Sequence, residues 1–233
     1  MSRWGAGRLF RRLLLLLLAA TLLWHGWIAV QLAWWRTHPP RETAFMAMRL
    51  DAMRAAGRTP QISYQWVDGD RISPQLKRAV LTAEDSRFVE HRGFDWDGIE
   101  HALRKNLARG KVVAGGSTIS QQLAKNLFLS DRRSVLRKAE EAVITVMLEA
   151  IVPKPRILEL YCNVVEWGDG IFGAEAAARH YYGRSAAQLN QVQAARLVVR
   201  LPDPRGTQRR GLSASQERRA ASIAARMHLV RLP

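Results

Sequence analysis

Cysteine and acidic residues are both scarce in this chain. Cys162 is the single cysteine among 233 residues, which excludes an intramolecular disulfide framework. It lies in the apolar segment 157–165, so we expect a small buried side chain rather than a reactive thiol. The chain has 20 acidic residues against 36 Lys and Arg, a formal net charge of +16. This surplus indicates an anionic partner: nucleic acid, a membrane surface or a phosphorylated ligand.

Metal-binding motifs and strand patterns are also nearly missing. The six histidines are scattered, and none belongs to an HExxH or Cys/His arrangement, so no certain metal site is predicted. Residues 62–67 alternate apolar and polar like a short strand, but elsewhere apolar residues recur at helical spacing. The sequence therefore predicts a mainly α protein, with a length that suits one domain plus an anchor.

One long hydrophobic run is present, at residues 13–35. It has no formally charged residue, and at about 1.5 Å per residue it covers roughly 30 Å or slightly more, enough for a transmembrane helix. Four arginines precede it: Arg3, Arg8, Arg11 and Arg12. They predict that residues 1–12 form a cytoplasmic basic segment. Four tryptophans fit an aromatic belt at the outer surface: Trp24, Trp27, Trp34 and Trp35.

A cleaved signal peptide is the alternative for this run, because residues 19–21 resemble a small-residue cleavage site. The apolar run continues well beyond them, which favours an uncleaved anchor. The remaining chain, starting with a juxtamembrane linker at 36–59, then lies outside the cytoplasm. That position disfavours nucleic acid and favours an anionic membrane surface as the partner of the positive charge.

Residues 115–129, GGSTISQQLAKNLFL, predict a helix with Ser117 as its N-cap. The helix carries two neighbouring polar rows at spacing four: Ser117, Gln121 and Lys125, then Thr118, Gln122 and Asn126. The leading glycines allow close backbone approach, and a helix N-terminus favours anions. By itself this stretch fits either a wall around an oxygen-rich ligand or an ordinary surface helix.

Two carboxylates stand at unusual places on neighbouring helices. A helix beginning at Ser73-Pro74 carries Glu84 and Asp85 near its C-terminal end, where the helix dipole disfavours negative charge. On the long helix predicted at 135–151, Glu141 follows Arg137 on a polar row. That row is either a salt-bridged surface row or part of an anion site. Two carboxylates with cations between them suit acid/base chemistry in which a phosphate leaves.

Four segments together resemble the signatures of one enzyme family. EDSRFVEHRGF (84–94) is similar to the EDxxFxxHxGF signature of the peptidoglycan glycosyltransferases, glycosyltransferase family 51, and GGSTISQQLAKN (115–126) matches the second signature in full. RKAEEAVITVMLE (137–149) and residues 154–183 resemble the third and fourth. The resemblance covers most of residues 60–205, in the family's order and spacing.

The resemblance implies a lysozyme-like helical glycosyltransferase domain at 60–205, followed by a basic helical tail at 206–233. It implies polymerisation of lipid II into glycan strands, inverting at the anomeric carbon and releasing undecaprenyl pyrophosphate. Glu84 then corresponds to the general base, and Lys125 and Arg137 to the pyrophosphate contacts. Glu141 corresponds to a second essential carboxylate, which either assists the leaving group or orders the cations or a divalent metal.

The remaining site residues follow from the same resemblance. Three polar residues correspond to positions in the substrate cleft: Thr118, Gln122 and Asn126. Four others correspond to supporting positions: Asp85, Phe88, His91 and Ser117. No cofactor is obligatory, while a divalent cation (Mg²⁺ or Mn²⁺) is compatible with the reaction. The expected partners are lipid II, the growing strand, the anionic membrane surface and cell-wall synthesis or division proteins, without nucleic acid. The expected location is the inner membrane, single-pass, with a periplasmic catalytic domain.

The sequence also departs from the family pattern. No set of SxxK, SxN and KTG boxes is present, so no transpeptidase activity is expected. Thr145, Cys162 and Gln193 replace the usual Ala, Leu and Glu, and Arg196 and Arg200 interrupt an apolar run. Two rival functions are a glycan-cleaving, lysozyme-like hydrolase, which needs no pyrophosphate site, and an inactive membrane-tethered scaffold.

Overall fold

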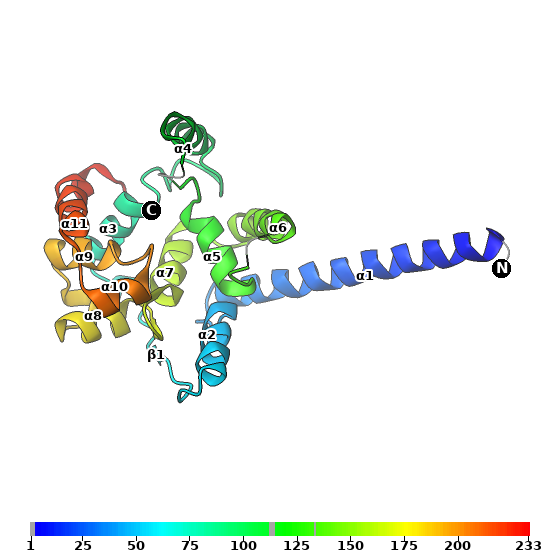
Figure 1. The fold of residues 1–233 in the computed structure, drawn as a ribbon, viewed down its shortest axis with the longest axis horizontal. Coiled ribbons are helices and arrows are strands. Elements are labelled where there is room, and N and C mark those ends of the chain that lie inside the picture. The colour runs from blue at the N-terminus through cyan, green and yellow to red at the C-terminus, as the bar shows by residue number, and fades with distance from the viewer. Residues whose placement is uncertain (1–2, 112–114, 133) are drawn as a thin grey trace.

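The chain forms a helical domain from which one long helix projects (Figure 1). The computed structural model describes residues 3–111, 115–132 and 134–233. Over these ranges the helices are α1 (Arg3–Trp35), α2 (Ala44–Ala55), α3 (Pro74–Glu84), α4 (Trp96–Arg109), α5 (Ile119–Phe128), α6 (Val135–Ile151), α7 (Lys154–Val164), α8 (Ala174–Tyr182), α9 (Gln191–Val198), α10 (Pro204–Arg210) and α11 (Ala214–Arg226). The strands are β1 (Ser63–Tyr64), β2 (Glu166–Gly168) and β3 (Ile171–Phe172). The predicted mainly helical architecture is confirmed.

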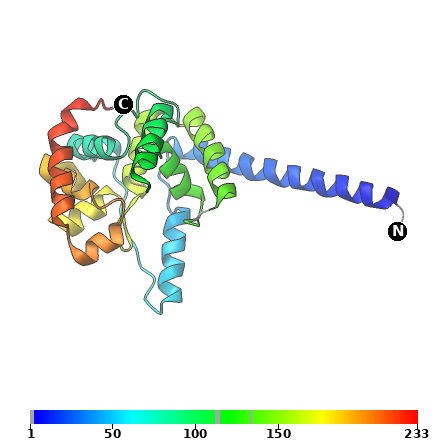
Figure 2. The same ribbon diagram turned by 45° about the horizontal axis from the view of Figure 1, so that its top comes forward.

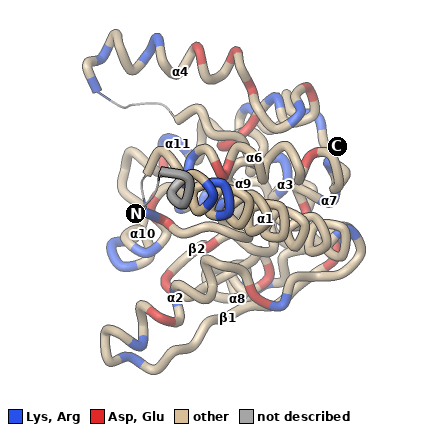
Figure 3. The backbone as a smooth tube through the Cα atoms, turned by 90° about the vertical axis from the view of Figure 1, so that its right-hand side faces the viewer, with Lys and Arg blue, Asp and Glu red and all other residues tan. Residues whose placement is uncertain are grey.

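Helix α1 contains the predicted membrane anchor. Within the described residues it is the one helix whose length and composition suit a membrane span, over Gly7–Trp35. Most of its leucines are exposed. Figure 3, which looks along this helix, shows Lys and Arg near its N-terminal end and other residue types along the rest. This arrangement fits a single-pass membrane protein.

The C-terminal part of α1 packs against the domain instead of standing free. Ile28 and Leu32 are fully buried. The rings of Trp27 and Trp35 lie 6.0 and 5.3 Å from the ring of Phe128, measured between centroids. Of the four tryptophans expected in an outer aromatic belt, Trp35 is therefore buried, because the end of α5 covers it. The other three remain exposed.

Helix α2 follows the span and lies crosswise to α1 in both views (Figures 1 and 2). Thr43 is its N-cap and accepts a hydrogen bond from the backbone N–H of Met46. Beyond α2, β1 pairs in parallel with β3, which pairs antiparallel with β2. The strand predicted at 62–67 is thus only two residues long, and residues 166–173 contain the β2–β3 hairpin.

The core is built mainly where helices cross. α3 packs on α9, and α5 packs on α6 and α7. The largest fully buried side chains include Trp167, Tyr161 and Phe88. Helix α11, from the basic C-terminal segment, packs on α9 and α3, and its Ile223 joins the same core. Cys162 is buried, as the sequence predicted, and burial raises the pKa of its thiol to about 12.

The polar residues that depart from the family pattern in and after α9 (Gln191–Val198) have partners in the structure. Gln193 completes a capping box with Asn190. Arg196 pairs with Glu217 at 2.8 Å, and the Arg200 guanidinium lies 4.0 Å from the ring centroid of Tyr181. These contacts explain how α9 tolerates residues that are unusual in an otherwise apolar run.

Candidate active site

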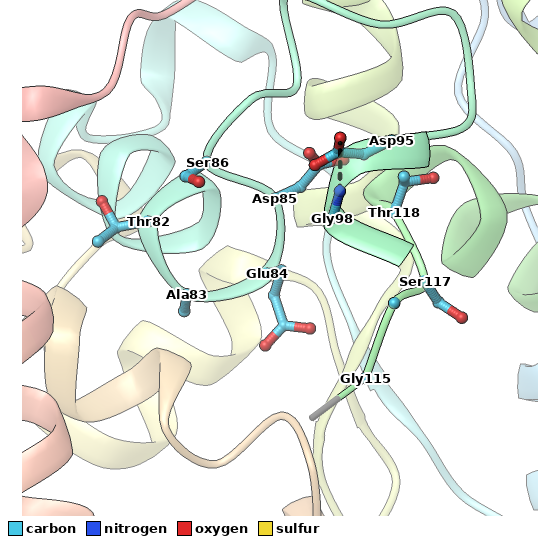
Figure 4. Close-up of a pocket in the computed structure, with 11 residues that line it drawn as sticks. Thr82, Ala83, Glu84, Asp85, Ser86, Asp95, Gly98, Gly115, Ser117 and Thr118 are labelled. Carbon is cyan, nitrogen blue, oxygen red and sulfur yellow. Dashed lines mark hydrogen bonds between the residues drawn. The ribbon is translucent and has the colours of Figure 1, made fainter. Parts of the chain in front are cut away.

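Glu84 is the last residue of α3 and lines a pocket of about 160 Å³. The helix starts as predicted, with Ser73 as N-cap and Pro74 in the first turn. The half-buried Glu84 side chain points away from Asp85, into the space in front of Gly115 and Ser117 (Figure 4). Helix α3 therefore delivers a carboxylate to the wall of an open pocket.

Asp85 joins the first and second signatures. One of its carboxylate oxygens lies 2.9 Å from Nε2 of His91, and the other accepts a hydrogen bond from the backbone N–H of Ile119 at 3.0 Å. Phe88 is buried beneath this turn, with Nζ of Lys154 4.1 Å from its ring centroid. Asp85, which directly follows Glu84, thereby ties the N-terminus of α5 to the C-terminal end of α3.

Asp85→Ala is expected to lower the free energy of unfolding by about 1.5–3 kcal/mol, because it leaves the Ile119 N–H and the His91 ring without their buried charged acceptor. Denaturant unfolding of the full chain in detergent measures this loss. Asp51→Ala is the control, since Asp51 pairs with Arg54 on the exposed surface. Equal stability of the two variants would contradict the role given to Asp85.

The N-cap of α5 is Thr118, and the prediction of Ser117 was wrong. Thr118 forms a capping box with Gln121, and its hydroxyl also donates to the backbone oxygen of Gly93 at 2.6 Å. Gly93 has φ +93°, and a Cβ there would lie 2.8 Å from Cγ2 of Thr145 on α6. Gly93 of the first signature, Thr118 of the second and Thr145 of the third therefore meet where the backbone at Gly93 passes close to α6. Ser117 stays outside the helix and lines the Glu84 pocket.

Gln122 connects α5 directly to Glu84. Its amide nitrogen donates to the Glu84 carboxylate at 2.9 Å, and its amide oxygen accepts from the hydroxyl of Tyr161 at 3.0 Å. Thr118, Gln121 and Asn126 are buried, so the polar rows of α5 lie partly against protein. Tyr161 was not predicted, because a tyrosine inside the apolar segment 157–165 gives no sign of its polar partner.

The surroundings of Glu84 raise the pKa of its carboxyl group. Loss of solvation is the main cause, and the negative charge of Asp85 adds to it. The hydrogen bond from Gln122 and the positive charge of Arg219 act in the opposite direction. Arg219 lies on α11, outside the recognised signatures, so sequence motifs gave no reason to select it.

Glu141 is the centre of a cluster of cations on α6. Its side chain is buried, Nη1 of Arg137 donates to one carboxylate oxygen at 2.6 Å, and Nζ of Lys138 contacts the other. The interpretation as a surface row of salt bridges is therefore wrong for Glu141, because neighbouring elements cover it. Lys138 was not among the predicted site residues, although it directly follows Arg137 in the sequence.

Lys125 extends this cluster from α5. Its ammonium lies 5.3 Å from the ring centroid of Phe45 on α2. Burial lowers the pKa of Lys125, the charge of Glu141 raises it, and Arg137 and Lys138 lower it further. The described residues thus bring Lys125, Arg137, Lys138 and Glu141 together, with more positive than negative charge, and Phe45 of α2 lies beside Lys125.

The Glu84 pocket and the cation cluster are neighbours, although Lys125, Arg137 and Glu141 do not line that pocket. Lys138 bridges them, since it contacts Glu141 and also donates to the Ser117 hydroxyl at 3.3 Å. Helix α5 bridges them a second time, because Gln122 and Lys125 are three residues apart and share a face. Glu84, whose carboxyl pKa is raised, therefore lies beside a cluster of cations that can attract an anion.

The donor set does not fit a divalent cation held by protein side chains alone. Within residues 3–111, 115–132 and 134–233, no group of three or more His, Cys, Asp or Glu is arranged so that it could hold a metal ion. Both oxygens of Glu141 already accept from Arg137 and Lys138.

Comparison with known proteins identifies the family. A family model described as Transglycosylase matches residues 52–228, three quarters of the chain. The chain belongs to this family. Curated biosynthetic peptidoglycan transglycosylases are similar: one from Azoarcus sp. (strain BH72) is 59% identical over 85% of this chain and 86% of its own length. Another, from Methylobacillus flagellatus, is 53% identical over 97% of this chain and 99% of its own length.

The family membership agrees with the chemistry of the site. This chain is a peptidoglycan glycosyltransferase, an enzyme that builds glycan for the cell wall. The family match extends through α11, so it includes Arg219, which contributes to the electrostatics of Glu84.

Proposed function

We propose that the enzyme polymerises lipid II into glycan strands and releases undecaprenyl pyrophosphate. The observation that supports this most directly is the double role of α5. Gln122 on this helix contacts Glu84, and Lys125 on the same face lies in the cation cluster. A base and an anion site are therefore held at a fixed separation by one rigid helix.

Glu84 acts as the general base in this proposal. The 4-hydroxyl oxygen of the acceptor sugar forms a bond to the anomeric carbon of the growing strand, its proton passes to Glu84, and the bond to the pyrophosphate breaks. Because the configuration inverts, the attacking oxygen and the leaving group lie on opposite faces of the sugar. A carboxylate with a raised pKa is the stronger base for this step.

Lys125 and Arg137 stabilise the negative charge that grows on the leaving pyrophosphate. Glu141 is a positioning residue that orders these cations. Its two oxygens are both engaged by Arg137 and Lys138, which supports this role over direct assistance to the leaving group. Thr118 and Ser117 line the pocket beside Glu84, where the acceptor sugar is expected.

The reaction takes place at the outer surface of the inner membrane in this proposal. The arginines before the apolar run of α1 support a cytoplasmic location for residues 1–12 and hence a periplasmic location for the catalytic domain. The lipid tail of the substrate stays in the bilayer while its sugars react above it. The anionic membrane surface and other cell-wall synthesis or division proteins are the further partners, and no transpeptidation is part of the proposal.

The test is incubation of the purified full-length enzyme with lipid II, followed by separation of the products by length. We expect long glycan strands, loss of the product with moenomycin, and continued synthesis in EDTA. Shortened or cleaved glycan from preformed strands would instead support the hydrolase. Lipid II that remains unchanged in an otherwise folded preparation would support the scaffold and overturn the proposal.

The pH dependence tests the base. Glu84 must be deprotonated to accept a proton, so kcat/KM should fall as the pH drops through its pKa, at a higher pH than the value of about 4.3 for an ordinary glutamate. Gln122→Leu removes a hydrogen bond that lowers this pKa, so the acid limb should move to higher pH. Tyr161→Phe, which leaves Gln122 less well oriented, should move the limb in the same direction by less. An unmoved limb in Gln122→Leu would contradict the assignment.

A further inference from the structure

A second basic site lies outside the catalytic region, between α2 and α10. It is a pocket of about 230 Å³ with four arginines in its wall. Its lining consists of Arg49, Ala52, Met53, Ala56, Arg58, Asp169, Arg205 and Arg209. None of the residues assigned above to the reaction lines it, so the proposed transfer reaction gives it no function.

The arginines in this pocket differ in how they are paired. Arg49 makes a bidentate pair with Glu166, at 2.7 and 2.8 Å, and Arg58 pairs with Asp169 at 2.7 Å. Arg205 and Arg209 are exposed and form no salt bridge with any residue that the structure describes. Four arginines therefore face two carboxylates, and the surplus positive charge sits on consecutive turns of α10.

The position of the pocket limits what its anion can be. Helix α1 ends at Trp35, and α2 begins nine residues later and lies crosswise to α1 (Figures 1 and 2). If α1 follows the membrane normal, α2 runs along the membrane surface, and the Met53 end of α2 stays near the level where the span ends. Arg49 and Met53, both on α2, are then close to the depth of the lipid headgroups, and α10 lies on the side of α2 that faces away from the span (Figures 1 and 2).

We propose that this arginine pocket binds the phosphate of an anionic phospholipid, such as phosphatidylglycerol. Guanidinium groups match phosphate oxygens in geometry, and Arg205 and Arg209 are available to form these bonds. Ala52, Met53 and Ala56 provide an apolar floor against which the glycerol part of the lipid packs. A bound lipid bridges α2 to α10 and fixes the orientation of the domain on the membrane. The proposal depends on α1 spanning the membrane, and it is independent of the chemistry assigned to Glu84.

Native mass spectrometry of the full-length enzyme in detergent tests this site. Phosphatidylglycerol is titrated against the enzyme and against the double variant Arg205→Gln/Arg209→Gln. Because an arginine near an anionic surface contributes a factor of about five, we expect the variant to bind the first lipid about 25-fold more weakly. Arg184→Gln/Arg218→Gln is the matched control, since it removes two exposed arginines that do not line the pocket.

Further arms distinguish the possible sources of the anion. Phosphatidylcholine carries the same phosphate without net charge and should bind weakly to all three proteins. Equal lipid binding by the double variant and the enzyme, or an equal loss in the control, would overturn the proposal. Displacement of the lipid by millimolar inorganic phosphate would assign the pocket to free phosphate instead, and preferential binding of an acidic muropeptide would assign it to the glycan product. Lipid II polymerisation by the double variant is measured in parallel, so a failure of the lipid site is not confused with a failure of the catalytic proposal.

Discussion

Glu84→Gln is expected to lower kcat for strand synthesis by about 10²–10⁴-fold, to the point where no polymer is detected. The amide cannot accept the proton of the acceptor hydroxyl. It can still accept the hydrogen bond from Gln122, so the helix packing around it should survive. Polymerisation of lipid II by the variant, measured under the conditions of the parent enzyme, checks this result.

Glu90→Gln is the matched control for this substitution. Glu90 lies in the same signature and pairs with Arg87 at an exposed site, outside the Glu84 pocket. It should polymerise lipid II at close to the parental rate. Strands of normal length from Glu84→Gln would remove Glu84 as the base, and equal loss in both variants would show that the turn, not the carboxylate, had been damaged.

Lys125→Met is expected to lower kcat by about 10²–10³-fold, because it removes a positive charge preorganised for the leaving pyrophosphate. Methionine keeps most of the length of the side chain and its contact with the Phe45 ring. Thermal unfolding should therefore change little while single-turnover synthesis slows. A raised KM with an unchanged kcat would instead show that the Lys125 charge stabilises the bound substrate and the transition state equally.

Lys125→Arg separates charge from shape at the same position. A guanidinium keeps the positive charge beside Glu141, so it should recover part of the lost rate. Lys105→Met, at an exposed position on α4, controls for the loss of a charge from this basic chain. If Lys125→Arg were as slow as Lys125→Met while remaining folded, packing rather than charge would explain the defect.

Several helices could be located from the sequence because their ends are set by neighbouring residues. The bounds predicted for α6, 135–151, agree with the structure. Ser134 caps α6, and Gly183, with φ +63°, ends α8 in the left-handed conformation. Capping and periodicity act over one or two turns, so they can be read along the chain without knowing what packs against it.

The N-cap of α5 could not be chosen from neighbouring residues alone. Ser117 and Thr118 are adjacent hydroxyl residues, and either suits an N-cap. The choice is made by segments distant in sequence: Gly93 accepts from the Thr118 hydroxyl, and Asp85 accepts from the N–H of Ile119. The same long-range packing buries Glu141 and places Arg219 of α11 near Glu84.

The sequence by itself determined the order of the signatures, the helical class, the apolar anchor and the residue types of a base and a cation cluster. These features depend on the types of residue present and on their spacing along the chain, so they can be recognised without knowing how the helices pack. Only the tertiary structure decided that Gln122 and Tyr161 support Glu84, that Lys138 joins Ser117 to Glu141, and that the end of α1 packs on Phe128. Such contacts join residues from different helices, and they form only when the side chains are packed together and shielded from water.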